Sequence, residues 1–260
     1  MHVELDSTIN DTNMIGSADR QLYERHRKRI QKNGFLRRIY QGWYETVQQN
    51  IPTGPGEILE LGAGSGFLRE VIPQVVSSDV VHLAGLSLVL DGQHLPFKAD
   101  SLKAVLMIDV LHHLPEPEVF FREAARTVEP GGVIIMIEPW VSAWSRLIYK
   151  NFHHEPYDQD AASWRIPVSG PMAGANIALP WIIFQRDRER FLREFPEWGI
   201  SAIVPETPFR YLLSGGVRCS SLLPASSEPI FRGLENCLSA WMSSLAMFAC
   251  IVLHRTDSRI

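Results

Sequence analysis

The stretch ILELGAGSGFL, residues 58–68, runs from an apolar segment through the acid Glu60 into three alternating glycines: Gly62, Gly64 and Gly66. Glycine weakens regular structure, so three glycines directly after a strand need a physical reason. Glycine reaches positive φ in a tight turn and lets a ligand approach the backbone closely. A helix expected over residues 67–72 would add unpaired N–H groups at its first turn. The stretch therefore predicts a strand, a glycine turn and a helix around a ligand-binding crevice.

Short runs rich in valine, isoleucine and leucine recur along the chain from this point. They are apolar without alternation, as is typical of strands that are covered on both faces of a parallel sheet. The runs cover residues 57–61, 75–81, 86–90, 104–110 and 132–137. A helical stripe of Phe120, Ala124 and Val128 lies between the last two runs. This alternation of strand and helix predicts an α/β fold with a doubly wound, Rossmann-like sheet.

Two helical patterns precede the sheet. They run from Ser17 to Asn50, are interrupted at Gly34, and end at the helix-breaking cluster PTGPG, residues 52–56. Residues 140–181 are rich in tryptophan, histidine, proline and glycine and interrupt the regular pattern that follows the last run. We therefore expect an N-terminal helical arm, a sheet domain, and a cap inserted into that domain, over residues 1–50, 51–260 and 140–181.

Regular patterns return after the cap. ALPWIIFQRDRERFLREFP has helical spacing, GISAIVPE is typical of a strand, and residues 247–253 form a last apolar run. Residues 227–246 are amphipathic, so we expect their apolar face to be buried on the sheet or against a second subunit, which leaves a homodimer open. That face carries Ile230, Leu234, Leu238, Trp241 and Leu245.

Composition limits the classes of protein that this chain can represent. The chain has 260 residues, of which 45% are hydrophobic, and its net charge is −4. That length can bury a large core, and the negative charge argues against a nucleic-acid binder. Three cysteines without a CxxC pair suggest neither a zinc site nor a disulfide framework. With no signal peptide and no apolar run of about 20 residues, we expect a soluble cytoplasmic protein without a transmembrane segment.

The arm is strongly basic. Eight lysines and arginines lie between Arg20 and Arg38 beside the single acid Glu24. A solvated helix face explains this pattern most simply. Peripheral contact with an anionic membrane surface, or attraction of an acidic substrate, stays open as an alternative.

Four carboxylates fall where apolar runs end: Glu60, Asp79, Asp91 and Asp109. The carboxyl ends of parallel strands meet at one edge of a sheet, where open α/β folds bind ligands. A carboxylate is costly in such a place unless something pairs with it. A single one could simply cap the following turn, but four in register with a glycine turn favour a binding site for amino and hydroxyl groups.

The spacing of the glycines separates two families of ligand-binding turn. The dinucleotide fingerprint is G-x-G-x-x-G, whereas this stretch is G-x-G-x-G and has Phe67 where the third glycine would fall. With Glu60 before the first glycine, the stretch resembles motif I of class I S-adenosylmethionine-dependent methyltransferases. Four further stretches resemble motifs of the ubiquinone/menaquinone-type members, in the expected order over residues 57–139: SSDVV, LVLDGQHLPF, MIDVLHHLP and VEPGGVIIMIEP.

The resemblance implies a fold, a cofactor and roles for particular residues. The sheet would have seven mostly parallel strands, with the last strand inserted antiparallel between strands five and six. S-adenosyl-L-methionine would bind at the glycine turn and at Glu60, with Asp109 completing the row of carboxylates. Asp79 would bind the ribose hydroxyls, Asp91 the adenine amino group, and the Gly92 N–H the adenine ring. Gly92 departs from the alanine that is usual in the family.

Methyl transfer from a sulfonium is a direct displacement, so the protein mainly aligns the acceptor and excludes water. A general base helps where the acceptor is a hydroxyl or an acidic carbon. His113 and His153 are the candidate catalytic residues, with a purely structural role as the alternative for each. His153, His154 and Glu155 also suggest a metal, but neighbouring residues of an extended segment point to opposite sides. We therefore expect no metal site.

The resemblance implies transfer of a methyl group to a small-molecule acceptor, most simply on oxygen or carbon. No nucleic-acid recognition module accompanies the motifs. A non-catalytic binding protein that retains the fold stays open, as does, less favourably, a nicotinamide-dependent oxidoreductase. The residues do not distinguish among acceptors, and they do not decide whether a base is used.

Overall fold

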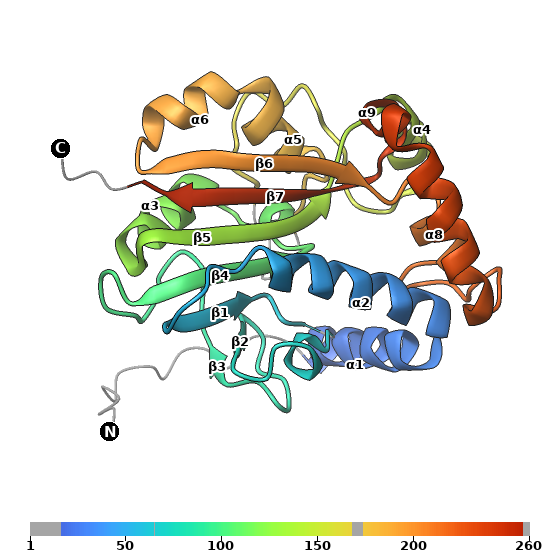
Figure 1. The fold of residues 1–260 in the computed structure, drawn as a ribbon, viewed down its shortest axis with the longest axis horizontal. Coiled ribbons are helices and arrows are strands. Elements are labelled where there is room, and N and C mark those ends of the chain that lie inside the picture. Colours follow the sequence, from blue (N-terminus) through green and yellow to red (C-terminus); the bar gives the residue numbers. More distant parts are fainter. Residues whose placement is uncertain (1–16, 65, 168–173, 257–260) are drawn as a thin grey trace.

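The structure is a computed structural model that describes residues 17–64, 66–167 and 174–256. Seven strands form one sheet in the order β3-β2-β1-β4-β5-β7-β6 (Figure 1). The strands β1 to β5 pair in parallel, whereas β7 runs antiparallel to both of its neighbours, β5 and β6. The predicted α/β fold with an antiparallel last strand is confirmed. The strands are β1 Glu57–Leu61, β2 Val76–Asp79, β3 Leu88–Val89, β4 Leu102–Ile108, β5 Val128–Pro139, β6 Trp198–Glu206 and β7 Phe248–Arg255.

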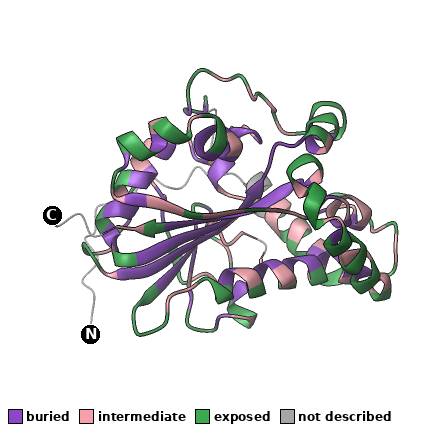
Figure 2. Ribbon diagram, turned by 45° about the horizontal axis from the view of Figure 1, so that its top comes forward, coloured by how far each residue is buried: buried purple, intermediate pink, exposed green. Residues whose placement is uncertain are grey.

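The central strands are apolar without alternation because both faces of the sheet are covered. In β4, Val105 and Met107 pack into one hydrophobic cluster, and Ala104 and Leu106 pack into the cluster on the opposite face. Figure 2 shows these strands as the buried centre of the molecule. The first cluster includes helices α3 (Pro117–Thr127), α5 (Leu179–Trp181) and α6 (Arg188–Glu194), and the second includes α2 (Gly34–Gln49) and α4 (Ala143–Phe152).

The predicted N-terminal helices are α1 (Ser17–Lys32) and α2. Asn33 separates them, and its side-chain oxygen accepts a hydrogen bond from the Leu36 N–H, which caps the start of α2. Leu36 and Val47 of α2 are fully buried against the sheet. The helical arm exists as expected. Its separation from the sheet as a domain of its own stays a prediction.

The helix expected over residues 67–72 is wrong. A single 3-10 turn, Leu68–Glu70, lies there instead. Pro73 follows closely and β2 begins at Val76, so the segment is too short for a helix of several turns. The crevice therefore receives no row of N–H groups from a helix start.

The expected burial of the C-terminal helix on the sheet is also wrong. The segment forms α8 (Glu228–Cys237), a 3-10 turn (Ser239–Trp241) and α9 (Met242–Leu245). Ile230, Leu234 and Trp241 are 65%, 55% and 66% exposed, whereas Leu238 and Leu245 are half-buried. Burial against a second subunit stays a prediction.

Helix α8 instead buries two carboxylates. Glu228 and Glu235 hydrogen-bond to Arg210 at the start of α7 (Arg210–Ser214). A buried arginine has to be paired, so α8 turns its charged residues inward and its apolar residues outward. Among the described helices, none is long and apolar enough to cross a membrane.

Candidate functional site

A cavity of about 400 Å³ lies where the carboxyl ends of β1, β2 and β4 meet. The sheet order brings together residues that are far apart in the chain, because β2, β1 and β4 are neighbours. All ten residues that the sequence predicts for the site line this cavity: Glu60, Gly62, Gly64, Gly66, Asp79, Asp91, Gly92, Asp109, His113 and His153.

Sequence reasoning missed a second part of the cavity wall. Tyr23 and His26 of α1 line the cavity, as do Tyr211 and Arg218 from the segment after β6. Tyr23 and His26 lie on the predicted inner face of the arm, so helical periodicity could have indicated them. Arg218 follows no recognisable motif, and only the fold brings it here.

The backbone conformation of the glycine turn and its close neighbours explain why it contains glycine. Gly62 and Gly64 have φ of +68° and +48°, a region that side chains disfavour. A Cβ at Gly62 would lie 2.5 Å from the Val110 side chain, and one at Gly66 would lie 2.7 Å from the Tyr44 hydroxyl. The turn therefore needs glycine for its conformation and for the close approach of neighbouring side chains.

Asp79 ties the end of β2 to the glycine turn. Its Oδ2 accepts a hydrogen bond of 2.8 Å from the Gly64 N–H, and its Oδ1 accepts one of 2.9 Å from the Val81 N–H. The Tyr23 hydroxyl donates to the same carboxylate at 3.4 Å. Burial raises the pKa of Asp79, and these N–H donors oppose that shift. The carboxylate is thus held at the cavity wall from three sides.

Glu60 is 5% exposed and lies at the end of β1. Burial, and then the neighbouring charge of Asp79, raise the pKa of Glu60 to about 8. The carboxyl is therefore mainly protonated at neutral pH. A cationic group of a ligand would favour its ionised form, which makes Glu60 a suitable partner for an ammonium.

Asp91 and Gly92 form the wall beyond β3. Asp91 Oδ1 accepts a hydrogen bond of 2.9 Å from the Gln93 N–H, so the loop holds this carboxylate at the cavity. A Cβ at Gly92 would lie 2.6 Å from the Leu61 side chain. This contact is a physical reason for glycine where the resembling family usually has alanine.

Two titratable residues follow β4. Asp109 has a φ of +63° and its N–H donates to the Ile137 carbonyl. Burial raises the pKa of Asp109 to about 7. His113 Nδ1 lies 3.2 Å from the Gly174 carbonyl oxygen, and burial lowers the pKa of His113 to about 4. The His113 imidazole is therefore neutral at neutral pH and able to accept a proton.

His153 approaches the same cavity from the end of α4. Its Nδ1 accepts a hydrogen bond of 3.3 Å from the Glu155 N–H. Burial lowers the pKa of His153 to about 4. The expectation that His153 and His154 point to opposite sides is wrong, since their rings stack with centroids 4.6 Å apart. A turn, not an extended segment, follows α4 and brings them together.

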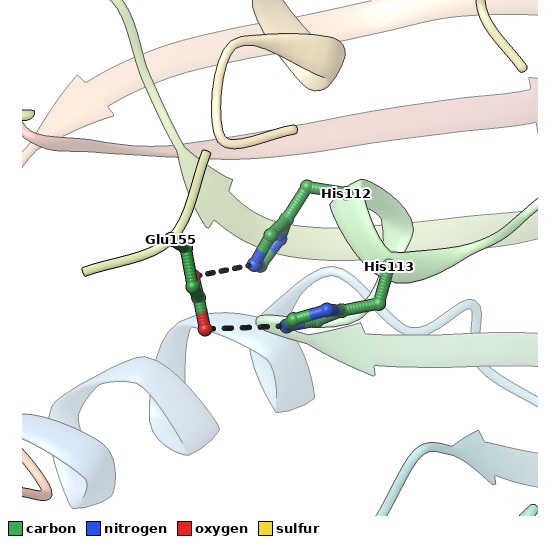
Figure 3. Close-up of side chains that lie close together, drawn as sticks. All are labelled: His112, His113 and Glu155. Atoms are coloured by element: carbon green, nitrogen blue, oxygen red, sulfur yellow. Dashed lines mark ion pairs between the residues drawn. The ribbon is translucent and has the colours of Figure 1, made fainter. Parts of the chain in front are cut away.

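The Glu155 carboxylate lies 3.4 Å from His154 Nε2, and it also approaches a second pair of histidines, His112 and His113 (Figure 3). Its oxygens lie 3.6 Å from His112 Nε2 and 3.7 Å from His113 Nε2. Burial lowers the pKa of His112, but the carboxylates of Glu138 and Glu155 outweigh it and raise the pKa well above its ordinary value. The adjacent histidines of MIDVLHHLP were the only sign in the sequence of this cluster, whose partner Glu155 comes from the other side of the cavity.

Comparison with known proteins agrees with the fold. Residues 59–136 match the model of the methyltransferase domain family. The PH0226 protein of Pyrococcus horikoshii is similar in structure, with a TM-score of 0.52 and 14% identity over 85% of this chain and 92% of that one. The geranyl diphosphate C-methyltransferase of Streptomyces coelicolor bound to S-adenosyl-L-homocysteine is also similar in structure. Its TM-score is 0.51, with 15% identity over 89% of this chain and 84% of that one.

A third similar structure comes from the complex between the Haloferax volcanii Trm112 methyltransferase activator and a methyltransferase. Its TM-score is 0.50, with 14% identity over 94% of this chain and 95% of that one. In sequence, uncharacterized protein MJ1123 of Methanocaldococcus jannaschii is 30% identical over 106 residues, 38% of this chain. The matched region spans 51% of the length of that relative.

Residues 59–136 therefore resemble a methyltransferase domain in sequence, and the sheet order and the glycine turn agree with the fold of the similar solved structures.

Proposed function

We propose that this chain transfers a methyl group from S-adenosylmethionine to a small-molecule acceptor. The observation that carries the proposal is the cavity in which four strand-end carboxylates and the glycine turn meet. A volume of about 400 Å³ lies within the usual range for small-ligand sites, roughly 300–1,000 Å³. The arrangement of the strands supports a cofactor that lies along the sheet edge from β3 to β4.

Each carboxylate has a part in this proposal. Asp79 binds the ribose hydroxyls, and Asp91 with the Gly92 N–H binds the adenine. Glu60 and Asp109 face the amino-acid part, and the turn of Gly62, Gly64 and Gly66 lets that part approach the backbone. The raised pKa of Glu60 supports this placement, because a ligand ammonium compensates a carboxylate that is otherwise costly to ionise.

The acceptor is methylated on oxygen or carbon, and a neutral histidine accepts its proton. His113 and His153 both line the cavity, and burial lowers the pKa of each to about 4, so both are unprotonated at neutral pH. These are weak bases, which suits an acceptor whose proton is already acidic.

The arm over residues 17–50 and the cap over residues 140–181 enclose the acceptor. Tyr23 and His26 from the arm, and Tyr149 and His153 from the cap, line the same cavity, which supports this proposal. An enclosed acceptor excludes water from the displacement, and it favours a small molecule over a polymer.

The test is methyl transfer from isotopically labelled S-adenosylmethionine to a panel of hydroxyl and carbon acids. We expect labelled product with the wild type and with the exposed-site control Asp160→Ala, and a large loss with Asp79→Ala. S-adenosylhomocysteine that binds without any transfer across a broad panel would favour the non-catalytic alternative instead.

A further inference from the structure

The three side chains of Figure 3 form ion pairs and also lie close enough together to bind one metal ion. His112, His113 and Glu155 each offer one ligand atom within 4.8 Å of the others. The Glu155 carboxylate lies 3.6 Å from His112 Nε2 and 3.7 Å from His113 Nε2, beyond the usual length of an N–H···O hydrogen bond, about 2.7–3.2 Å. His154 Nε2 lies 3.4 Å from the same carboxylate. Two ligands about 2.1 Å from a tetrahedral zinc lie roughly 3.4 Å apart, which is close to the observed spacing.

The other nitrogen of each imidazole is already engaged. His112 Nδ1 lies 2.8 Å from Glu138 Oε2, and His113 Nδ1 lies 3.2 Å from the Gly174 carbonyl oxygen. In both rings the acceptor favours a proton on Nδ1. The neighbouring carboxylates also favour a proton on His112 Nε2, so a metal ion that binds there would displace that proton and use the lone pair on Nε2. Histidines that bind metals in proteins are held in the same way, by a carboxylate or a carbonyl on the far nitrogen.

Backbone hydrogen bonds hold the Glu138 carboxylate in the position from which it orients the His112 ring. Its Oε1 accepts hydrogen bonds of 2.8 and 2.7 Å from the N–H groups of Val110 and Leu111, and its side chain is fully buried. The carboxylate therefore has one oxygen for the backbone and one for His112. The orientation of the His112 ring follows from this arrangement.

His112 Nε2 is left without a partner. The residue is fully buried, and this atom has no hydrogen bond to any described residue. A buried polar atom without a hydrogen bond is unfavourable, so the position of His112 Nε2 needs a cause. Asp109 Oδ1 faces the same atom at 3.9 Å, which adds another carboxylate to the surroundings.

We propose that His112 Nε2, His113 Nε2 and the Glu155 carboxylate bind a divalent transition-metal ion of the zinc class. Two imidazoles and a carboxylate suit Zn²⁺, Co²⁺ or Fe²⁺, whereas Mg²⁺ prefers oxygen ligands alone. The site replaces the sequence-based expectation of no metal, which considered Glu155 only with His153 and His154.

The ion would lie at the edge of the cofactor cavity, because His113 and Glu155 line it. There it would bind an oxygen or sulfur donor of the acceptor and lower the pKa of a bound hydroxyl. With His113 on the ion, the proton-accepting role falls to His153. This part of the inference rests on the proposed function, whereas metal binding itself does not.

The test is titration of the untagged protein with Co²⁺, followed by its visible absorption, without cofactor or acceptor. We expect one Co²⁺ per chain, displaced by Zn²⁺. His113→Gln and Glu155→Gln should each weaken binding by at least about tenfold. The matched controls His82→Gln and Glu189→Gln, at exposed positions, should bind as the wild type does.

A variant of Glu138, which positions His112, distinguishes metal binding by His112 from a purely structural role of that histidine. Glu138→Gln keeps the oxygen that faces the backbone but presents an amide N–H₂ to His112 Nδ1, which forces the proton to Nε2. We expect Co²⁺ affinity to fall about 10- to 100-fold, with the His112 tautomer reversed in ¹⁵N NMR spectra. Absence of Co²⁺ absorption in the wild type, or equal absorption in the folded His113 and Glu155 variants, would overturn the site; if one variant fails to fold, the other decides.

Discussion

At the residue scale, Asp79 is the carboxylate with the clearest double role. It holds the Gly64 N–H and also lines the cavity, so it connects the shape of the turn to ligand binding. We predict that Asp79→Ala and Asp91→Ala each weaken S-adenosylhomocysteine binding. A hydrogen bond to a charged group contributes about 1.5–3 kcal/mol, which corresponds to roughly ten- to a hundredfold in affinity.

Calorimetry of the folded variants measures this loss. The exposed Asp160→Ala serves as control and should bind as tightly as the wild type. Unchanged affinity in both cavity variants would mean that the ends of β2 and β3 do not face the cofactor.

The glycine turn gives a second prediction. Gly64→Val introduces a branched side chain at a φ of +48°, and its Cβ would meet the Tyr23 ring at 3.0 Å. We expect S-adenosylhomocysteine binding to be lost. Gly54→Val is the matched control, because Gly54 also has positive φ but nothing lies within 4 Å of an added Cβ. Equal loss of binding in both variants would point to backbone strain alone.

Glu60 makes stability depend on pH. Its pKa is about 8 in the folded chain against an ordinary value of 4.5, so between these pH values unfolding releases a proton. The contribution of Glu60 to stability is therefore greatest at low pH, falls as pH rises toward 8, and is constant above. Glu60→Gln removes this loss.

We predict that Glu60→Gln gains stability relative to the wild type between about pH 5 and 8, by a few kcal/mol at about 1.4 kcal/mol per pKa unit. Urea unfolding of both proteins across that pH range measures the difference in their free energy of unfolding. The contributions of the other titrating groups cancel in this difference. If the free energies of unfolding of the two proteins change in parallel with pH, Glu60 is ionised in the folded chain.

Much of the site could be predicted from single residues. A carboxylate at the end of an apolar strand has few uses, so the sequence alone indicates that Glu60, Asp79 and Asp109 lie at the cavity. Arg218 could not be predicted, because no periodicity or spacing connects it to the strands. Nor could the approach of Glu155 to His112, since it depends on how the chain turns after α4.

At the element scale, α8 shows what an amphipathic pattern leaves undecided. Helical spacing defines two faces, but it does not say which face is buried when the polar one carries the partners of a buried arginine. Arg210 is 8% exposed and hydrogen-bonds Glu228 and Glu235. The apolar face with Ile230 and Leu234 is consequently exposed.

We predict that Arg210→Ala destabilises the protein by about 3–5 kcal/mol, because the buried Glu235 carboxylate loses its arginine and Glu228 keeps only Arg232. Ile230→Ser, on the exposed face of the same helix, should change stability by less than about 0.5 kcal/mol. Urea unfolding compares the two. A larger effect of Ile230→Ser would restore the original expectation that the apolar face is buried, in solution, against another surface.

Strands were easier to predict than helices. Runs such as residues 104–110 are too apolar to lie anywhere but the core, and β4 occupies nearly that range. The helix expected after the glycine turn does not form, because Pro73 and the start of β2 at Val76 leave too few residues for it.

At the scale of the whole molecule, the sheet order β3-β2-β1-β4 makes one cavity from separate motifs. The motifs could be recognised in sequence because each belongs to one strand end. The wall from the segment after β6 could not, because its residues meet the strands only in the folded chain. The acceptor is therefore the least predictable part of the site.

The most direct test of the account is calorimetric titration of the wild type with S-adenosylhomocysteine and, separately, with NADH. The glycine spacing and the four strand-end carboxylates predict that S-adenosylhomocysteine binds with one molecule per chain and that NADH gives no heat beyond dilution. Tight binding of NADH without binding of S-adenosylhomocysteine would contradict the account and favour a nicotinamide-dependent oxidoreductase.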